Sequence, residues 1–337
     1  MTPDYSVDRV DIYQGHVLDM LAALPDESVH CVVTSPPYWG LRDYGLPAVV
    51  WPDGWSGSLG LEPTPALYVE HMVAVFREVR RVLRADGTCW LNLGDCYFTS
   101  PHGPIGANSS DPKSAVRERQ GTQANRQRSI AGLKHKDLVG IPWRVAFVLQ
   151  DDGWYLRSDI IWHKPNTMPE SVTDRPTKAH EYVFLLAKSP HYFYDIEAVK
   201  EPNQGPLPWG GRATSKHEND WAQGRHGHSS LFKPGQTRAD KMKWSTNGRN
   251  RRSVWTIATK PFKGAHFATF PPDLVKPCIL AGTSALGVVL DPFAGSGTTC
   301  EVAYQLGRRS IGIEMSPEYL KLIAKRLDLA IQQGTLL

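Results

Sequence analysis

The 337-residue sequence predicts an α/β protein with a mainly parallel sheet. Short apolar runs rich in β-branched residues alternate with longer stretches of helical periodicity, in the first hundred residues and again from residue 137. Near the C-terminus, one continuous run has the pattern of strand, glycine-rich turn, helix and second strand. Strands that alternate with helices in this way are typical of parallel sheets covered by helices.

Each element follows from its local pattern. The longest helix has apolar residues at Met72, Val75, Phe76 and Val79 and a predicted stop at Asp86-Gly87. Strands are predicted at 10–15, 29–35, 88–95, 154–164, 180–189, 191–195, 285–293 and 308–314. Helices are predicted at 17–27, 67–87, 137–153, 271–282, 298–307 and 317–333.

Two irregular stretches interrupt the alternation, and both are basic. Residues 99–136 hold seven Lys or Arg against two Asp or Glu, and residues 200–252 hold eleven against four. Because the whole chain has a formal net charge of only +4, these stretches carry +12 and the remainder −8. Such asymmetry is expected when one face binds a polyanion. For 99–136 a solvated loop is an equal alternative, whereas Trp209, Trp221 and Trp244 among the basic residues of 200–252 favour nucleic-acid contact.

The composition excludes several other classes. Five cysteines form no CxxC pair, which predicts reduced core residues of a cytosolic protein and neither a disulfide framework nor a metal site. No apolar run approaches the ~20 residues of a membrane span. The first residues lack the basic and apolar regions of a signal peptide, so a cytoplasmic location is expected.

The run from Val288 to Glu314 predicts a cofactor site. A strand ends at Asp291, the chain turns through two glycines, and a helix begins at about Thr298. Glu314 ends the next strand 23 residues after Asp291, close to the spacing of a carboxylate that holds ribose hydroxyls. A purely structural βαβ unit is the alternative. The missing GxxxxGK[ST] pattern disfavours a P-loop, and Cys300 replaces the third glycine of GxGxxG.

The stretch TSPPYWG, residues 34–40, directly follows a buried strand. Alone, such a stretch is usually a rigid surface turn. Because open α/β sheets place ligands at the carboxyl ends of their strands, it is here a candidate site. His163, Lys164 and Asn166 also follow a strand and are candidates to line the pocket, although a lone histidine there is more often structural.

TSPPY followed much later by DPFAGSGTT resembles the amino-methylating DNA methyltransferases of the permuted (β) group. The resemblance covers most of the chain and implies a Rossmann-like sheet of the S-adenosylmethionine-dependent methyltransferase type, with circularly permuted motif order and irregular basic insertions. It divides the chain into a catalytic half at 1–98 and 137–199, a basic loop insertion at 99–136, a target-recognition region at 200–255 and a cofactor-binding half at 256–337. Where many relatives carry Gly-Asp before the catalytic strand, this chain has Gly15-His16.

The resemblance also implies roles for single residues. The catalytic set is Ser35, Pro36, Pro37 and Tyr38: the Ser35 side chain and the Pro36 carbonyl would accept the two N–H groups of an exocyclic amine, the prolines would fix the turn, and Tyr38 would stack on a flipped base. No metal is required. The residues implied to hold S-adenosylmethionine are Thr34, Phe267, Thr269, Phe270, Pro271, Asp291, Pro292, Phe293, Ala294, Gly295, Ser296, Gly297, Thr298, Thr299 and Glu314.

The implied substrate is double-stranded DNA, methylated at a specific sequence. Candidate DNA-binding residues are Arg212, Lys216, Arg225, Lys233, Arg238, Lys241, Lys243, Arg249, Arg251 and Arg252. In the resembling families Ser-Pro-Pro-Tyr is commoner among cytosine N4 enzymes and Asp-Pro-Pro-Tyr among adenine N6 enzymes, so Ser35 favours cytosine. Adenine N6 methylation, a DNA-binding protein without turnover, and a small-molecule or RNA methyltransferase are the alternatives. A homodimer and a cognate restriction endonuclease are partners that the family suggests, in a bacterial or phage-infected cell.

Overall fold

The computed structural model describes residues 2–41, 43–98, 132–202, 248–260 and 271–334. The chain forms two compact units, of which the larger comprises Met1–Asp195 with Ser253–Leu337 and the smaller Ile196–Arg252. Within the described residues, no helix is long and apolar enough to cross a membrane. All five cysteines are buried and free, as predicted.

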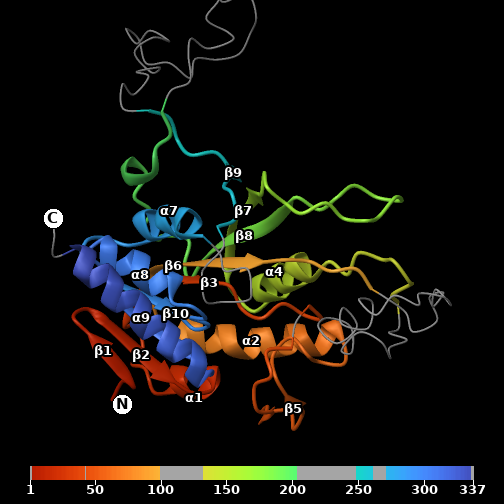
Figure 1. Cartoon of the computed structure of the whole chain (residues 1–337), viewed down its shortest axis with the longest axis horizontal. Helices are drawn as coiled ribbons and strands as arrows, with labels where there is room; N and C mark the ends of the chain where they lie inside the picture. Colours follow the sequence, from red (N-terminus) through yellow and green to blue (C-terminus); the bar gives the residue numbers. More distant parts are fainter. Residues whose placement is uncertain (1, 42, 99–131, 203–247, 261–270, 335–337) are drawn as a thin grey trace, which may run out of the picture. The chain divides into compact units, whose positions relative to one another are not determined.

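The larger unit is built on a nine-stranded sheet (Figure 1). From one edge to the other its strands are β1 (Tyr5–Val7), β2 (Val10–Gln14), β11 (Arg309–Glu314), β10 (Val288–Asp291), β3 (Val29–Thr34), β6 (Leu83–Leu93), β8 (His180–Ala187), β7 (Tyr155–His163) and β9 (Val254–Thr256). The five strands from β2 to β6 all pair in parallel, as do β7 and β9, whereas β1 and β8 pair antiparallel with their neighbours. The predicted α/β fold with a mainly parallel sheet is therefore confirmed. A separate short hairpin joins β4 (Val49–Val50) and β5 (Ser56–Gly57).

Two groups of helices pack on the sheet. The first comprises α1 (Val17–Ala22), α2 (Pro65–Val82) and α4 (Ile141–Asp151), and the second α7 (Pro272–Gly282), α8 (Thr298–Gln305) and α9 (Pro317–Gly334). Successive residues of β6 show that the groups lie on opposite faces. Leu91 belongs to the core formed with α2 and α4. Its neighbour Trp90 points to the other face and packs against α7, where a Cβ added at Gly282 would lie 2.9 Å from Nε1 of Trp90.

The longest helix ends earlier than its sequence pattern predicts. α2 stops at Val82, and Leu83 already has the extended backbone of β6. Leu83 pairs with Val29 of β3, so residues whose apolar periodicity continues that of the helix belong to the sheet instead. At the other end, Thr64 caps the helix by accepting a hydrogen bond from the backbone N–H of Leu67.

The predicted strand at 191–195 is wrong. Its backbone donates to two different elements: the N–H of Phe193 to the carbonyl of Asp86, at 2.8 Å, and the N–H of Asp195 to the carbonyl of Ala281, at 2.9 Å. These two contacts anchor the segment, which forms no ladder with any strand that the structure describes.

The smaller unit is described at Ile196–Pro202 and Gly248–Arg252. A short 3₁₀ turn, η1 (Glu197–Val199), is followed by a backbone bridge in which Glu201 and Arg249 exchange hydrogen bonds of 2.9 and 2.8 Å. The sequence predicts a target-recognition region at 200–255, which overlaps this unit, and its role in reading DNA stays a prediction.

Candidate active site

The two predicted motifs begin at the carboxyl ends of neighbouring strands. β3 ends at Thr34 and leads into Ser35, and β10 ends at Asp291 and leads into the glycine turn. The strands pair in parallel, with Val289 opposite Cys31, so both loops leave the sheet at the same edge. The chain continues from β10 to β11 on one side and from β3 to β6 on the other, and open α/β sheets bind ligands at such a switch point.

Asp291 joins the two motifs. Its Oδ1 accepts hydrogen bonds from Thr34 Oγ1, at 2.7 Å, and from the N–H of Phe293, at 3.1 Å. Its Oδ2 accepts one from Thr299 Oγ1, at 2.7 Å, and Thr299 also contacts the carbonyl of Val33. Burial raises the pKa of Asp291 to about 6, although its hydrogen bonds act in the opposite direction.

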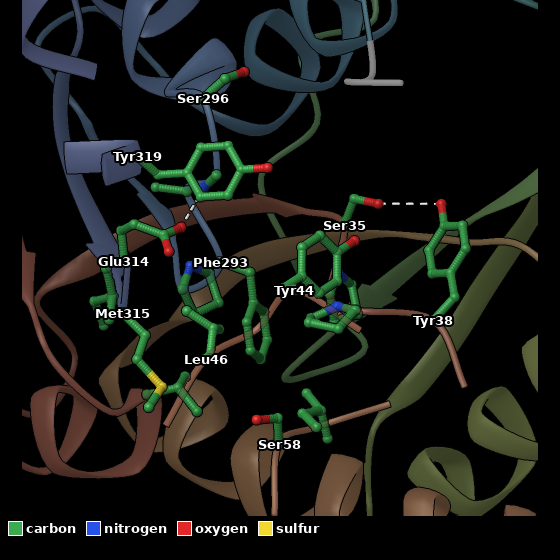
Figure 2. A pocket seen from close by; sticks show the side chains of 18 of the residues that line it. Ser35, Tyr38, Tyr44, Leu46, Ser58, Phe293, Ser296, Glu314, Met315 and Tyr319 are labelled. Atoms are coloured by element: carbon green, nitrogen blue, oxygen red, sulfur yellow. Dashed lines mark hydrogen bonds between the residues drawn. The ribbon is translucent and has the colours of Figure 1, made fainter. Parts of the chain in front are cut away.

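The motifs line one cavity of about 300 Å³. Figure 2 shows Ser35 and Tyr38 on one side of it and Ser296 and Glu314 on the other. The predicted residues that line the cavity are Ser35, Pro36, Pro37, Tyr38, Pro292, Phe293, Ala294, Gly295, Ser296, Thr298 and Glu314. Those that lie behind its wall are Thr34, Asp291, Gly297 and Thr299, whereas Pro271 caps the start of α7. Phe267, Thr269 and Phe270 lie outside the described residues.

The cofactor end of the cavity has a carboxylate held by backbone. Glu314 accepts hydrogen bonds of 2.8 Å from the N–H groups of Gly295 and Ser316, and burial raises its pKa to about 7. Gly295 and Gly297 have φ of 53° and 79°, in the left-handed region that glycine adopts without strain. The turn therefore depends on its glycines and places Glu314 beside the start of α8.

The residues at this end fit S-adenosylmethionine. Glu314 supplies an acceptor for ribose hydroxyls, the start of α8 favours a carboxylate, and Phe293, Met315 and Tyr319 supply apolar surface. His16, which stands where many relatives carry aspartate, also lines the cavity. Its Nε2 is buried and has no hydrogen-bond partner among the described residues, so a polar group is available for a ligand there.

Arg326, from α9, supports the cofactor turn from behind. Its Nη1 donates to the carbonyl and to the Oγ of Ser296, and to Thr298 Oγ1, each at 3.0 Å, while its Nε contacts Glu301 Oε2 at 2.5 Å. Sequence reasoning missed this arginine because it lies in an amphipathic helix with other charged residues and far along the chain from the turn.

The catalytic end of the cavity contains a polar network. Ser35 Oγ lies 3.1 Å from the Tyr38 hydroxyl, which donates to Glu181 Oε2 at 2.9 Å. Asn92 Nδ2 contacts all three groups, and Lys164 Nζ pairs with the other oxygen of Glu181. Glu181 and Asn92 were not predicted, because they come from β8 and β6 and are brought to the TSPPYWG loop only by strand pairing.

Of the three candidates at and after the end of β7, only Lys164 lines this cavity. Nδ1 of His163 lies 3.2 Å from Thr256 Oγ1, and the Asn166 side chain exchanges hydrogen bonds with the backbone of Thr259. His163 thus joins the end of β7 to β9, and Asn166 joins the β7–β8 connection to the residues after β9.

The TSPPYWG loop is held in place by its surroundings. The Tyr68 hydroxyl donates to the Pro37 carbonyl at 2.9 Å, and the indole N–H of Trp39 donates to the Glu62 carbonyl at 3.0 Å. A Cβ added at Gly94 would lie 2.6 Å from Cε2 of Tyr38, so the aromatic ring packs directly on the backbone at that position. The loop is therefore fixed at Pro37, Tyr38 and Trp39.

Among the predicted DNA-binding residues, Arg249, Arg251 and Arg252 belong to the described part of the smaller unit. Arg249 and Arg252 both pair with Glu201 Oε2, at 3.4 and 3.1 Å. The others, from Arg212 to Lys243, lie outside the described residues.

Comparison with known proteins identifies the family of this chain. A family model described as DNA methylase matches residues 29–326. The type II methyltransferase M.XycI of Xanthomonas campestris pv. cyanopsidis is 46% identical over 317 residues, covering 94% of this chain and 87% of that protein. M.SmaI of Serratia marcescens is 43% identical over 316 residues, covering 94% and 90%.

Solved structures share the fold. The cytosine-N4-specific PvuII DNA methyltransferase aligns with a TM-score of 0.60 and 20% identity, covering 96% of this chain and 88% of that one. A putative DNA modification methylase of Thermus thermophilus, in complex with S-adenosyl-L-methionine, aligns with a TM-score of 0.53 and 21% identity, covering 96% of each chain. The chain therefore belongs to the N6/N4 DNA methylase family and is a DNA methyltransferase with S-adenosylmethionine as its cofactor.

Proposed function

We propose that this enzyme transfers the methyl group of S-adenosylmethionine to the exocyclic N4 of cytosine in double-stranded DNA. The observation that carries the choice of base is Ser35 at the head of the catalytic tetrad, with its hydroxyl in the cavity. Ser-Pro-Pro-Tyr is commoner among cytosine N4 enzymes of the resembling families. Adenine N6 methylation on the same scaffold is the alternative.

The chemistry of an exocyclic amine explains what the loop must do. The nitrogen lone pair is delocalised into the ring, so hydrogen-bond acceptors at the two N–H groups are needed to localise it. Ser35 Oγ and the Pro36 carbonyl are the proposed acceptors. The neighbouring contacts of Pro37 and Trp39 keep this loop in one conformation, so no reorganisation is required during the reaction.

The cofactor, when bound, supplies an electrophilic methyl group. On the protein side, Glu314 would hold its ribose hydroxyls, and the backbone N–H groups at the start of α8 would hold its carboxylate. Phe293, Met315 and Tyr319 would exclude water around its adenine. Because these residues share one cavity with Ser35, the proposed methyl donor and amine acceptors belong to the same site.

DNA recognition is proposed for the basic stretches. A base inside a duplex cannot reach a recessed cavity, so the target base must be flipped out, with Tyr38 as its stacking partner. The basic residues of 200–252 would contact phosphates and base edges. The relatives named above are type II methyltransferases, and we propose that this chain is likewise the modification enzyme of a restriction–modification system. The homodimer, the cognate endonuclease and the cytoplasmic location stay predictions.

Nucleoside analysis tests the proposal. Genomic DNA from a host without DNA methyltransferases is incubated with the enzyme and methyl-labelled S-adenosylmethionine, digested to nucleosides and separated by mass spectrometry. Labelled N4-methylcytosine is the expected product, and labelled N6-methyladenine alone would reject cytosine. Absence of both, with cofactor binding intact, would favour the DNA-binding protein without turnover.

A further inference from the structure

In the network at the catalytic end of the cavity, the number of available protons determines which group donates each hydrogen bond. Glu181 is a carboxylate paired with the Lys164 ammonium, so its oxygens can only accept. The single hydroxyl proton of Tyr38 therefore points to Glu181 Oε2, 2.9 Å away. The oxygen of Tyr38 is left as an acceptor, and the Ser35 hydroxyl, 3.1 Å from it, is the donor in that contact.

This direction determines what Ser35 can offer a substrate. With its proton turned towards Tyr38, Ser35 Oγ presents lone pairs. One of them faces the amide of Asn92, at the long distance of 3.3 Å, and the other is available in the cavity. An oxygen in this state accepts a hydrogen bond from an amine N–H, whereas the opposite orientation would place a donor against a donor.

We propose that Glu181 is a positioning residue that orients the hydroxyl groups of Ser35 and Tyr38. These two hydroxyls form a relay that removes the proton lost by the target amine. The inference rests on the proposed function only in requiring that an exocyclic amine binds at Ser35, and it holds for cytosine or adenine.

The proton balance is complete within these groups. The amine nitrogen uses its lone pair to form a bond to the methyl carbon, whose bond to sulfur breaks with both electrons remaining on sulfur. The methylated nitrogen is then positively charged and passes one proton to Ser35 Oγ. Ser35 passes its own proton to the Tyr38 oxygen, and Tyr38 passes its proton to Glu181 Oε2. The products are a neutral methylamine and a protonated Glu181, which loses its proton to water after the product leaves.

The surroundings suit Tyr38 to this task. Burial and the charge of Glu181 raise the pKa of Tyr38 well above its ordinary value, so the phenol keeps a proton at neutral pH and transfers one only as it receives another. Its ring is fixed against the backbone of Gly94. Asn92 Nδ2 donates at 2.5 Å to the Tyr38 oxygen and at 3.0 Å to Glu181 Oε2. These contacts keep Ser35, Tyr38 and Glu181 aligned for proton transfer.

The alternative is that Glu181 only pairs with Lys164 to stabilise the fold. A double-mutant cycle separates the two roles, because residues that act as one unit show non-additive losses. The variants are Glu181→Gln, Tyr38→Phe and the double variant, with Glu78→Gln as a control. Glu78 is another ion-paired carboxylate, which contacts Arg81 on α2 and does not line the cavity.

The experiment measures single-turnover methyl transfer to the same genomic DNA, with enzyme in excess, and the cofactor dissociation constant of each variant. Because general acid–base groups contribute about 10²–10⁴-fold, each single variant is expected to slow transfer about 10²-fold or more. The double variant should be no slower than the slower single one. Cofactor affinity should stay within about twofold, and Glu78→Gln should match the wild type.

The proposal would be overturned if the rate reductions of the two single variants multiplied in the double variant. An unchanged rate in Tyr38→Phe would also overturn it. So would a Glu181→Gln variant that loses cofactor binding in proportion to its rate. The nucleosides released in the same assay report which base the wild type methylates, so failure of the cytosine assignment is visible separately and leaves these rate ratios intact.

Discussion

The Thr34 hydroxyl donates a 2.7 Å hydrogen bond to Asp291, although 257 positions separate the two residues in the sequence. Thr34 immediately precedes the catalytic tetrad, and Asp291 ends the strand that leads into the glycine turn. A contact between the ends of β3 and β10 thus fixes the distance between the loop proposed to hold the amine and the loop proposed to hold the cofactor.

Thr34→Val is predicted to weaken this link. The substitution keeps the shape of the side chain but leaves a buried Asp291 oxygen with one partner fewer, which costs about 1–3 kcal/mol. Denaturant unfolding should show that loss, and methyl transfer should slow more than cofactor binding weakens. Ser6→Ala is a suitable control, because it removes an exposed hydrogen bond to Asp11. Equal losses in both variants would contradict the special role of Thr34.

Arg326→Met is predicted to loosen the cofactor turn. It removes three contacts of 3.0 Å to Ser296 and Thr298 and leaves Glu301 without its arginine partner. Calorimetric titration with S-adenosylmethionine should give a dissociation constant raised about tenfold, equivalent to about 1.4 kcal/mol. An Arg77→Met control removes an exposed pair with Asp152 and should bind normally. Unchanged affinity in Arg326→Met would exclude a supporting role.

Cofactor binding should depend on pH through Glu314. Its pKa is raised to about 7 in the folded protein, so below pH 7 the carboxyl is increasingly protonated and must lose a proton before ribose hydroxyls can bind a carboxylate. The dissociation constant should therefore rise by up to about tenfold per pH unit below pH 7. His16 does not reproduce this dependence, because burial lowers its pKa and keeps the imidazole neutral near pH 7. Glu314→Gln should bind more weakly at pH 8 and show a flat profile; a profile unchanged by the substitution would exclude Glu314.

Gly94→Ala should impair the catalytic end alone. The added methyl group would meet Tyr38 Cε2 at 2.6 Å and displace the ring from the hydrogen bonds it makes with Ser35 and Glu181. The transfer rate should fall about 10²-fold, as expected when a proton-transfer group is misplaced, while cofactor affinity is kept. A rate close to that of the wild type would show that Tyr38 can shift without consequence.

The sequence predicted the parts of the site that depend on local pattern. The strand before Ser35 and the unit from Val288 to Glu314 have glycines, prolines and apolar runs in fixed order, so their form could be inferred without knowing what packs against them. Asp291 was predicted to contact the cofactor, but its carboxylate lies behind the cavity wall and accepts hydrogen bonds from Thr34 and Thr299.

Features set by distant partners could not be predicted. Glu181 reaches Tyr38 and Asn92 because β8 pairs antiparallel with β6, and nothing in the sequence of either strand specifies this pairing. The end of α2 at Val82 has the same origin, since the next residues continue its apolar pattern and only pairing with β3 draws Leu83 into the sheet. Tertiary contacts override local propensity in both cases.

The role of Ser35 in cytosine N4 methylation is tested most directly by comparing the nucleosides produced by the wild type and by Ser35→Ala under the same conditions. N4-methylcytosine is the expected product of the wild type, with the yield reduced at least about 10²-fold in Ser35→Ala and cofactor binding retained. N6-methyladenine as the product, or an undiminished yield from Ser35→Ala, would contradict it.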